Sequence, residues 1–373
     1  MGIIGVVAFV AALLFSVMVH EYGHYATARR YGMRVTEFFL GFGKRVWSTQ
    51  RGETEFGLKA IPAGGYCKIS GMSLHEPMED EVKHRAFYLA STPKKLVVLG
   101  AGSFLHFVLG FFLLFTLFAG VGTSQVLPRV SQVVDCVPSA NECKATDPIS
   151  PAKQVGILAG DEILGVNGEK LSWDKVGEIL RSSAQKPITL EGEARGFLGI
   201  INEYGLVRQN PISAIRTSTE ASVAIFQGSI KALIGLPAQI PSLLRQTFLG
   251  EERQADGLVG IVGVARASGE TVSSGILTTG EKLATFLLIV ASLNIFVGIF
   301  NLLPILPLDG GHMAVALYEG GRRKFAQLRG RPDPGYVDVE KLTPITMAVF
   351  LALAFLTLLL LVADIFNPIN LNL

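Results

Sequence analysis

The chain has 373 residues, of which 49% are hydrophobic and only 17% are charged. Soluble globular proteins carry about 25% charged residues, so this composition argues against both a disordered chain and a typical cytosolic enzyme. The formal net charge of +2 excludes a strongly basic nucleic-acid-binding protein, and three cysteines are too few for a disulfide scaffold.

Four apolar runs predict four transmembrane helices, because each is close to the roughly 20 residues that cross a bilayer as a helix. They cover residues 3–19, 96–120, about 284–308 and about 346–363. We do not expect the first run to be a cleaved signal peptide, since no basic residue precedes it and Arg29 and Arg30 follow it.

The distribution of lysine and arginine predicts the orientation of these helices. Both residue types are denser in 29–95 and 319–341 than in 121–282. Loops rich in lysine and arginine stay in the cytoplasm. We therefore expect 29–95 and 319–341 to be cytoplasmic, and the long middle segment and both termini to be extracytoplasmic.

Two connecting segments have patterns of their own. The cytoplasmic segment after the first helix shows short alternating runs at 46–49, 54–60 and 66–69, which predict a β-hairpin at or in the membrane. Residues 225–236 and 240–249 are amphipathic and are separated by prolines, which predicts interfacial helices broken at Pro237 and Pro241. A further span in this region is disfavoured.

The extracytoplasmic segment contains a pattern that resembles a PDZ domain. A helix-like stretch from Ser150 leads to a turn at Gly160 and a strand at 162–166, and a helix at 173–183 and a strand at 188–191 follow. An unrelated small α/β domain is the alternative.

The cysteines divide between the two sides of the membrane. Cys136 and Cys143 lie in the exported segment, where disulfides persist, so we predict a disulfide between them, with two free thiols as the alternative. Cys67 lies on the cytoplasmic side, and we expect it to be structural or inert.

The first apolar run ends in the sequence His20-Glu-Tyr-Gly-His24. Residues four apart share one face of a helix, so both imidazoles can hold one zinc ion with Glu21 beside it as general base. Ionisable groups are costly inside a bilayer and need a reason to be there. The alternative is that the span ends before His20 and the three side chains lie at a solvated helix end.

A hydrolytic zinc site needs a third protein ligand. Glu37 and Glu53 are possible, but they lie in the β-like segment. Asp309 is the better candidate, because it follows the third apolar run and a carboxylate there must be paired, metal-bound or hydrated. Pro304 and Pro307 would unwind the chain just before it. The alternative is a plain turn at the end of the span.

Together these motifs resemble the site-2 protease family of intramembrane zinc metalloproteases, in its bacterial RseP-like branch with a single PDZ domain and in an actinobacterial version of that branch. The resemblance covers almost the whole chain. Its motifs are His20–His24 with Ala28-Arg29-Arg30, the turns Gly41-Phe-Gly43 and Ile61–Tyr66, the PDZ-like unit, and Leu308-Asp-Gly-Gly311.

The resemblance implies roles for individual residues. His20, His24 and Asp309 match the zinc ligands, Glu21 matches the catalytic base, and Asn301 matches an asparagine that contacts the substrate backbone. The hairpin around Thr54–Ile69 matches the element that holds substrate as an added strand, and the residues assigned to substrate binding there are Thr54, Glu55, Phe56, Gly57 and Leu58.

Two positions depart from the family pattern. His106 stands where the family often has an asparagine, and Asn294 does not align with a family asparagine, so no role is carried over to either. A buried, hydrogen-bonded histidine and a histidine that approaches the zinc site are both possible for His106.

The resemblance implies a multi-pass enzyme of the bacterial plasma membrane with its active site near the cytoplasmic side. It would contact lipid, bind Zn²⁺ and cleave single-span membrane proteins, such as anti-sigma factors or remnant signal peptides, after a first extracytoplasmic cut. The alternative is an inactive, PDZ-bearing membrane scaffold. The sequence does not predict the oligomeric state.

The expected fold is a core of four transmembrane helices with a cytoplasmic-side hairpin and an extracytoplasmic PDZ domain. Its parts are 1–120 with the first two spans and the hairpin, 125–215 with the PDZ-like domain, 216–282 as an amphipathic linker, and 283–373 with the last two spans.

Overall fold

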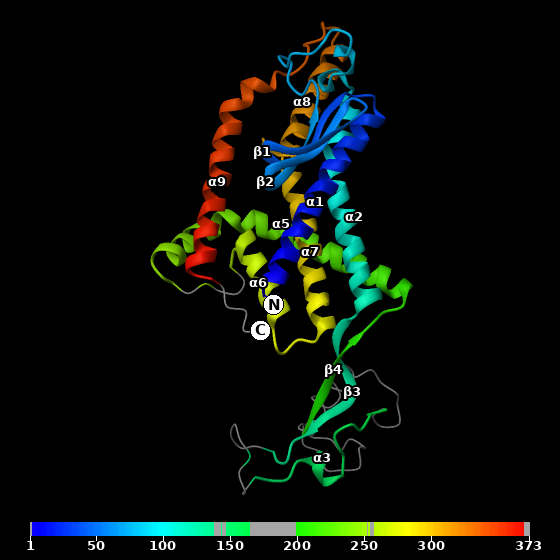
Figure 1. Cartoon of the computed structure of the whole chain (residues 1–373), viewed down its shortest axis with the longest axis vertical. Coiled ribbons are helices and arrows are strands. Elements are labelled where there is room, and N and C mark those ends of the chain that lie inside the picture. The colour runs from blue at the N-terminus through cyan, green and yellow to red at the C-terminus, as the bar shows by residue number, and fades with distance from the viewer. Residues whose placement is uncertain are drawn as a thin grey trace. The chain divides into compact units, whose positions relative to one another are not determined.

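A computed structural model of the chain describes residues 2–137, 143, 147–164, 199–251, 253 and 257–368. The chain divides into two compact units, Met1–Gly120 with Asn210–Leu373, and Val121–Gln209. The first unit is mainly helical and the second is built around a small sheet (Figure 1).

The helical unit is organised around α1, α2 and α7, which pack against one another (Figure 1). Small residues allow these helices to approach closely, as in other membrane bundles. A Cβ on Gly23 would lie 2.6 Å from Ala101 O, and a Cβ on Gly110 would lie 2.8 Å from Ile295 Cγ1. The helices are α1 Gly2–Arg30, α2 Thr92–Phe115, α5 Pro211–Phe248, α6 Ile261–Ser273, α7 Thr279–Asn301, α8 Asp309–Leu328 and α9 Thr343–Phe366.

Five helices among the described residues are long and apolar enough to cross a membrane: α1, α2 with the turn after it, α5, α7, and α9 with the turn before it. Four correspond to the predicted spans. The fifth, α5, is the least apolar of the set. It contacts α7, and Figure 1 shows it crossing that helix rather than running along it.

The prediction that prolines break the segment 225–249 is wrong. Helix α5 runs from Pro211 to Phe248 with Pro237 and Pro241 inside it. A proline removes one backbone hydrogen bond and bends a helix, but it does not have to end one when the flanking residues remain helical. Helix α6 begins at Ile261, with Gly260 as its N-cap.

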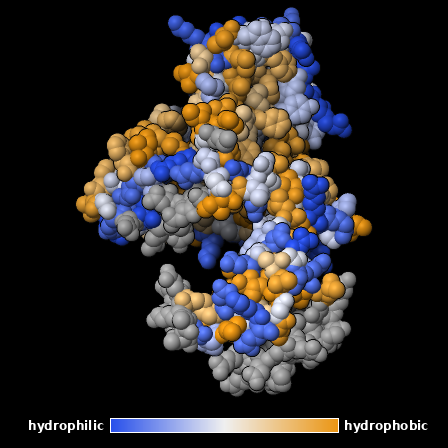
Figure 2. Space-filling model, turned by 60° about the horizontal axis from the view of Figure 1, so that its bottom comes forward, coloured by the Kyte–Doolittle hydropathy of each residue, from blue (hydrophilic) through white to orange (hydrophobic). Residues whose placement is uncertain are grey.

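Large apolar side chains are exposed on the surface of the helical unit, and Figure 2 shows extensive hydrophobic areas over it. Phe104 and Phe112 on α2 are 63% and 58% exposed, and Phe355 on α9 is 59% exposed. Such a surface is suited to lipid rather than water. The chain is accordingly a multi-pass membrane protein.

Strands β1 (Val35–Arg51) and β2 (Thr54–Ile69) form the sheet predicted after the first helix. The three short runs of the prediction are parts of two long strands, because irregular pairing carries the chain through the glycine-rich interruptions. Gly41 and Gly43 have φ angles of +90° and +84°, which favour glycine, and several register shifts follow along the pair.

An apolar cluster fixes this sheet against α1 and α2. Val35 begins β1 and Ile69 ends β2, and the two residues are paired neighbours. They pack with Ala28 of α1 and with Val98 and Leu99 of α2. Their burial holds the sheet beside the part of α1 that carries His20 and His24.

The second unit contains β3 (Thr123–Val133), β4 (Ile200–Val207) and the short helix α3 (Pro151–Gln154). Cys136 and Cys143 are joined in a disulfide with their Cα atoms 5.9 Å apart. The predicted helix at 173–183 and strand at 188–191 lie outside the described residues, as does the end of the strand predicted at 162–166. A PDZ fold therefore stays a prediction.

Candidate metal centre

Helix α1 presents His20 and His24 on one face, as their spacing predicts. Each side chain belongs to a residue that is only 7% exposed, and the helix continues without a break to Arg30. The alternative of a solvated helix end therefore does not hold: both histidines are buried inside the helical unit.

Asp309 reaches the same place from a distant part of the chain. The residues between α7 and α8 form a tight turn, and Asp309 is the first residue of α8. The turn needs the two glycines that follow, because a Cβ on Gly310 would lie 2.2 Å from Leu302 O and one on Gly311 would lie 2.4 Å from Leu306 N. The two glycines thus allow the tight turn between α7 and α8, and this turn brings the Asp309 carboxylate to the two histidines.

Three donor atoms meet at this point. His20 Nε2 and His24 Nε2 are 3.0 Å apart, and Asp309 Oδ2 lies 3.2 Å from the first and 3.3 Å from the second. Ligands of a tetrahedral zinc ion at about 2.0–2.1 Å are separated by about 3.3 Å. The triangle is therefore the size of one face of a zinc coordination tetrahedron.

The surroundings of the donor atoms also fit a cation. Asp309 Oδ2 is buried and accepts no hydrogen bond among the described residues. His24 Nδ1 lies 2.8 Å from Val98 O, a group that can only accept, so Nδ1 carries the proton and Nε2 keeps its lone pair. This arrangement fixes the tautomer that binds a metal through Nε2.

The other acidic candidates are occupied elsewhere. Glu53 is bound by Arg85 Nη1 and Nη2 at 2.7 Å each, which holds the pKa of its carboxyl below the usual value. Glu37 pairs with Lys59 and Lys68 and accepts a hydrogen bond from Tyr66. The geometry therefore selects Asp309 as the third candidate ligand.

Glu21 lies between the donor triangle and the sheet. It is half-buried. A Cβ on Gly65 would lie 3.4 Å from Glu21 Cγ, and the backbone of Cys67 lies near the Glu21 carboxylate. The carboxylate is thus placed beside the candidate metal and against the strand segment that starts at Gly65.

The expectation that residues 54–58 offer an open strand edge is wrong. Residues 35–40 pair with 65–69 on one side, residues 37–40 pair with 55–58 on the other, and 54–58 also pair with 47–51. Gly57, for example, faces both Phe39 and Ser48. A strand with partners on both sides has no free backbone groups for a third, so substrate cannot add there.

The side chains of this segment are also engaged within the sheet. Thr54 is buried and donates a hydrogen bond to Val35 O at 2.7 Å, and Glu55 pairs with Arg45 at 2.7 Å. Phe56 packs edge-on against Tyr25 of α1. Leu58 is the exposed member of the set. These contacts make 54–58 a structural strand that holds the sheet to α1.

Asn301 is the last residue of α7 and is half-buried. It leads into the turn that delivers Asp309.

No role was predicted for His106 and Asn294, and the structure places both next to the candidate site. His106 Nδ1 lies 2.8 Å from Asn294 Oδ1, and the His106 ring centroid is 5.0 Å from that of His20. Both residues are almost fully buried, at 2% and 1% exposure. Two polar residues within apolar runs were the only signal in the sequence, and it did not say which groups would pair.

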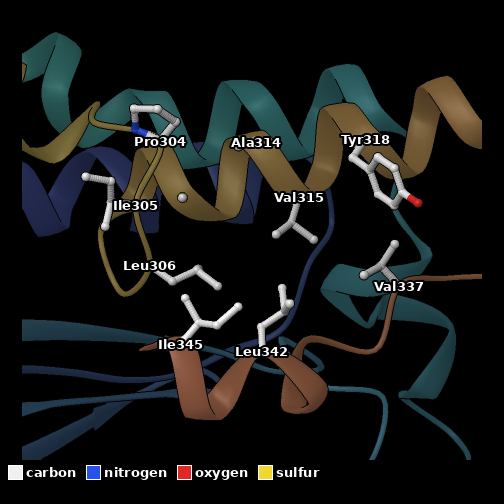
Figure 3. Close-up of a pocket in the computed structure, with 10 residues that line it drawn as sticks. Pro304, Ile305, Leu306, Ala314, Val315, Tyr318, Val337, Leu342 and Ile345 are labelled. Atoms are coloured by element: carbon white, nitrogen blue, oxygen red, sulfur yellow. The ribbon is translucent and has the colours of Figure 1, made fainter. Parts of the chain in front are cut away.

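An apolar cavity of about 460 Å³ borders the turn that precedes Asp309. Figure 3 shows it between that turn, α8 and the start of α9, with Leu306 of the turn pointing toward Leu342 and Ile345. Gly311, two residues after Asp309, is part of its wall. The candidate metal centre therefore has an apolar cavity beside it.

Comparison with known proteins agrees with this geometry. The sequence model of Peptidase family M50 matches residues 8–332. The zinc metalloprotease Rip1 of Mycobacterium tuberculosis is 31% identical over an alignment of 408 residues, which covers 100% of this chain and 99% of that protein. Rip1 of Mycolicibacterium smegmatis is 31% identical and is covered, like this chain, to 98%.

Proposed function

The chain belongs to Peptidase family M50, the site-2 protease family of zinc metalloproteases, and we propose that it hydrolyses peptide bonds of single-span membrane proteins within or near their transmembrane segments. The predicted family is thereby confirmed. The inactive-scaffold alternative has no support, and we do not propose it.

The proposed catalytic centre consists of His20, His24 and Asp309 as zinc ligands and Glu21 as general base. The observation that carries it is the buried triangle of donor atoms at 3.0–3.3 Å. Bound zinc supplies a water of lowered pKa and a Lewis acid for the scissile carbonyl. Glu21 accepts the proton of the attacking water and delivers it to the leaving amine.

Substrate must unwind before it can be cut, because a helix pairs its own carbonyls. Unwinding in a membrane requires new backbone partners. Among the described strands, residues 65–69 pair only with 35–40, and they lie against Glu21 through Gly65 and Cys67. We place the substrate strand at this edge rather than along 54–58.

Other elements complete the proposed path. The cavity beside the 302–308 turn has an apolar lining, which suits side chains that come from inside a bilayer. We propose that Asn301, which lies at the start of this turn, holds a backbone group of the unwound segment.

The proposed orientation places the sheet and α8 on the cytoplasmic side and both termini outside. Gly2 at the start of α1 packs against Gly269 of α6, and Asp364 near the end of α9 accepts a hydrogen bond from Gly263 N of α6. The two termini are thus at the same end of the helical unit, which supports placing them on one side of the membrane. The second unit, proposed as a PDZ domain, then faces outward.

The test compares purified wild type with Glu21→Gln in detergent. Both proteins are expected to contain one zinc per chain, because Glu21 is not a ligand, and only wild type should cleave a single-span substrate whose ectodomain has been removed. Cleavage by Glu21→Gln at the wild-type rate would contradict the proposed base. Absence of zinc from folded wild type would contradict the whole centre.

A further inference from the structure

The two histidines of the candidate site differ in how their second nitrogen is held. A metal-binding histidine nearly always donates its other N–H to an acceptor, which fixes the ring orientation. His24 Nδ1 has Val98 O as its acceptor. His20 Nδ1 is buried and has no hydrogen-bond partner among the described residues. An acceptor for this N–H has to come from the immediate surroundings.

A hydrogen-bond network determines which way the Asn294 amide faces. The Ser16 hydroxyl donates to Ala12 O at 2.9 Å, so Ser16 Oγ accepts from Asn294 Nδ2 at 3.0 Å. Val290 O, which can only accept, lies 2.8 Å from the same Nδ2. Both contacts require the amide nitrogen on this side, and they leave Asn294 Oδ1 to face His106.

The amide orientation then determines the tautomer of His106. Asn294 Oδ1 can only accept, so His106 Nδ1, at 2.8 Å, must carry the proton. In the neutral ring, Nε2 of His106 is therefore an acceptor with a free lone pair. By accepting the hydrogen bond of His106 Nδ1, Asn294 thus leaves Nε2, on the opposite side of the His106 ring, as a hydrogen-bond acceptor.

The His106 ring, which carries this acceptor, lies beside His20, the histidine whose Nδ1 has no acceptor. The ring centroids of His20 and His106 are 5.0 Å apart and the rings are tilted by 38°. No direct hydrogen bond joins the two side chains among the described residues, so a contact between their nitrogens at this separation runs through one bridging water. The Nδ1 edge of His20 faces α2, since a Cβ on Gly102 would lie 2.6 Å from His20 Nδ1. His106 is on the same helix, one turn after Gly102.

We propose that His106 is a positioning residue for the metal centre: its Nε2, left unprotonated by the Asn294–Ser16 network, accepts the hydrogen bond of His20 Nδ1–H through one bridging water and so aims His20 Nε2 at the metal. The inference rests on the proposed zinc site. His106 of α2, held by Asn294 of α7, would orient the ring of His20, just as the backbone carbonyl of Val98 orients the ring of His24.

Two substitutions separate this role from a purely structural one. In His106→Asn, the side chain reaches the position of Nδ1, so the contact with Asn294 is kept and the far acceptor is lost. In His106→Gln, the side chain reaches the position of Nε2, so the far acceptor is kept and the contact with Asn294 is lost. Zinc loss to a chelator is measured for the full-length proteins in detergent.

We expect His106→Asn to lose zinc about tenfold faster than wild type and His106→Gln to stay within about twofold. The reverse order, or equal rates in all three proteins, would overturn the inference while leaving the zinc site in place. Wild type without zinc would instead overturn the proposed function.

Ser103 is the control, because its hydroxyl is buried on α2 and has no partner among the described residues. Faster zinc loss from Ser103→Ala alone would make Ser103 the acceptor and contradict the role of His106.

A measurement on the unaltered protein keeps the inference testable if a variant does not fold. Nitrogen-15 NMR of histidine-labelled, zinc-loaded protein distinguishes protonated from unprotonated ring nitrogens. We expect one histidine that is not bound to metal to be protonated at Nδ1 with Nε2 accepting a hydrogen bond, and this signal to disappear in His106→Gln. A His106 signal protonated at Nε2 would contradict the inference.

Discussion

His20 and His24 can share one metal ion because each ring is held by a different neighbour. Val98 O fixes the orientation of His24, and the Asn294–His106 pair lies beside His20. Asp309 brings the negative charge that two neutral imidazoles lack. Removal of any of these groups would leave a buried polar atom without a partner, which costs about 1–3 kcal/mol.

Cys67 gives a residue-scale prediction. Burial, and to a lesser degree the negative charge of Glu21, raise the pKa of its thiol to about 12. Because the thiolate is the reactive form, native Cys67 should carry about a thousandfold less thiolate at pH 8 than a thiol with the ordinary pKa of 9. Its alkylation, followed by mass spectrometry, should be very slow and should accelerate up to about pH 12.

The unfolded protein is the control for this measurement. Denaturation should restore ordinary reactivity to Cys67, whereas Cys136 and Cys143 should stay unreactive unless a reductant opens the disulfide. Equal alkylation rates for native and denatured Cys67 at pH 8 would contradict its burial beside Glu21.

At the scale of elements, the site depends on how closely α2 approaches α1. A Cβ on Gly102 would lie 2.5 Å from His20 Cε1 and 2.6 Å from His24 Nε2, so even a methyl group must displace both rings. We expect Gly102→Ala to fold and to lose most of its zinc, measured as metal per chain.

Gly100 provides a matched control on the same helix. A Cβ there would meet only Met313, at 3.7 Å, which is an ordinary van der Waals contact. Gly100→Ala should keep its zinc. If both variants retain one zinc per chain, the close approach of α2 is not what shapes the site.

Features that depend on residues close together in the sequence could be predicted from the sequence. The spacing of His20 and His24 and the apolar runs are local patterns, and so they indicated the metal motif, four of the candidate spans and the family. Asp309 was selected among three carboxylates because a charge at the end of an apolar run needs a partner.

Features that depend on distant pairing were not predictable in the same way. The alternating pattern predicts a strand at 54–58, but its two neighbours are set by pairing with other parts of the chain. The pattern of this segment alone therefore does not distinguish a central strand from an edge strand. The continuity of α5 through Pro237 and Pro241 depends on the surrounding structure. The partnership of His106 with Asn294 joins residues 188 positions apart.

At the scale of the whole molecule, the proposed chemistry belongs to one of the two units. His20, Glu21, His24 and Asp309 all lie in the unit Met1–Gly120 with Asn210–Leu373. The described residues of the second unit contribute no ligand to the donor triangle. Metal binding should therefore be independent of the second unit, whereas the choice of substrate need not be.

A deletion tests this separation. Thr123 and Val207 are paired neighbours at the ends of β3 and β4, so a short glycine-serine linker can replace residues 124–206. The shortened protein should bind one zinc and cleave a single-span substrate without an ectodomain. The same deletion with Glu21→Gln is the control for activity. A folded, shortened protein without zinc would show that the second unit is needed for the metal site.

The most direct test of the central claim is X-ray absorption spectroscopy at the zinc edge on the purified full-length protein. We predict two imidazole ligands and light oxygen ligands at about 2.0–2.1 Å, with the oxygen contribution altered and zinc retention reduced in Asp309→Ala. A sulfur ligand at about 2.3 Å, or a spectrum unchanged in a zinc-loaded Asp309→Ala protein, would contradict the site formed by His20, His24 and Asp309.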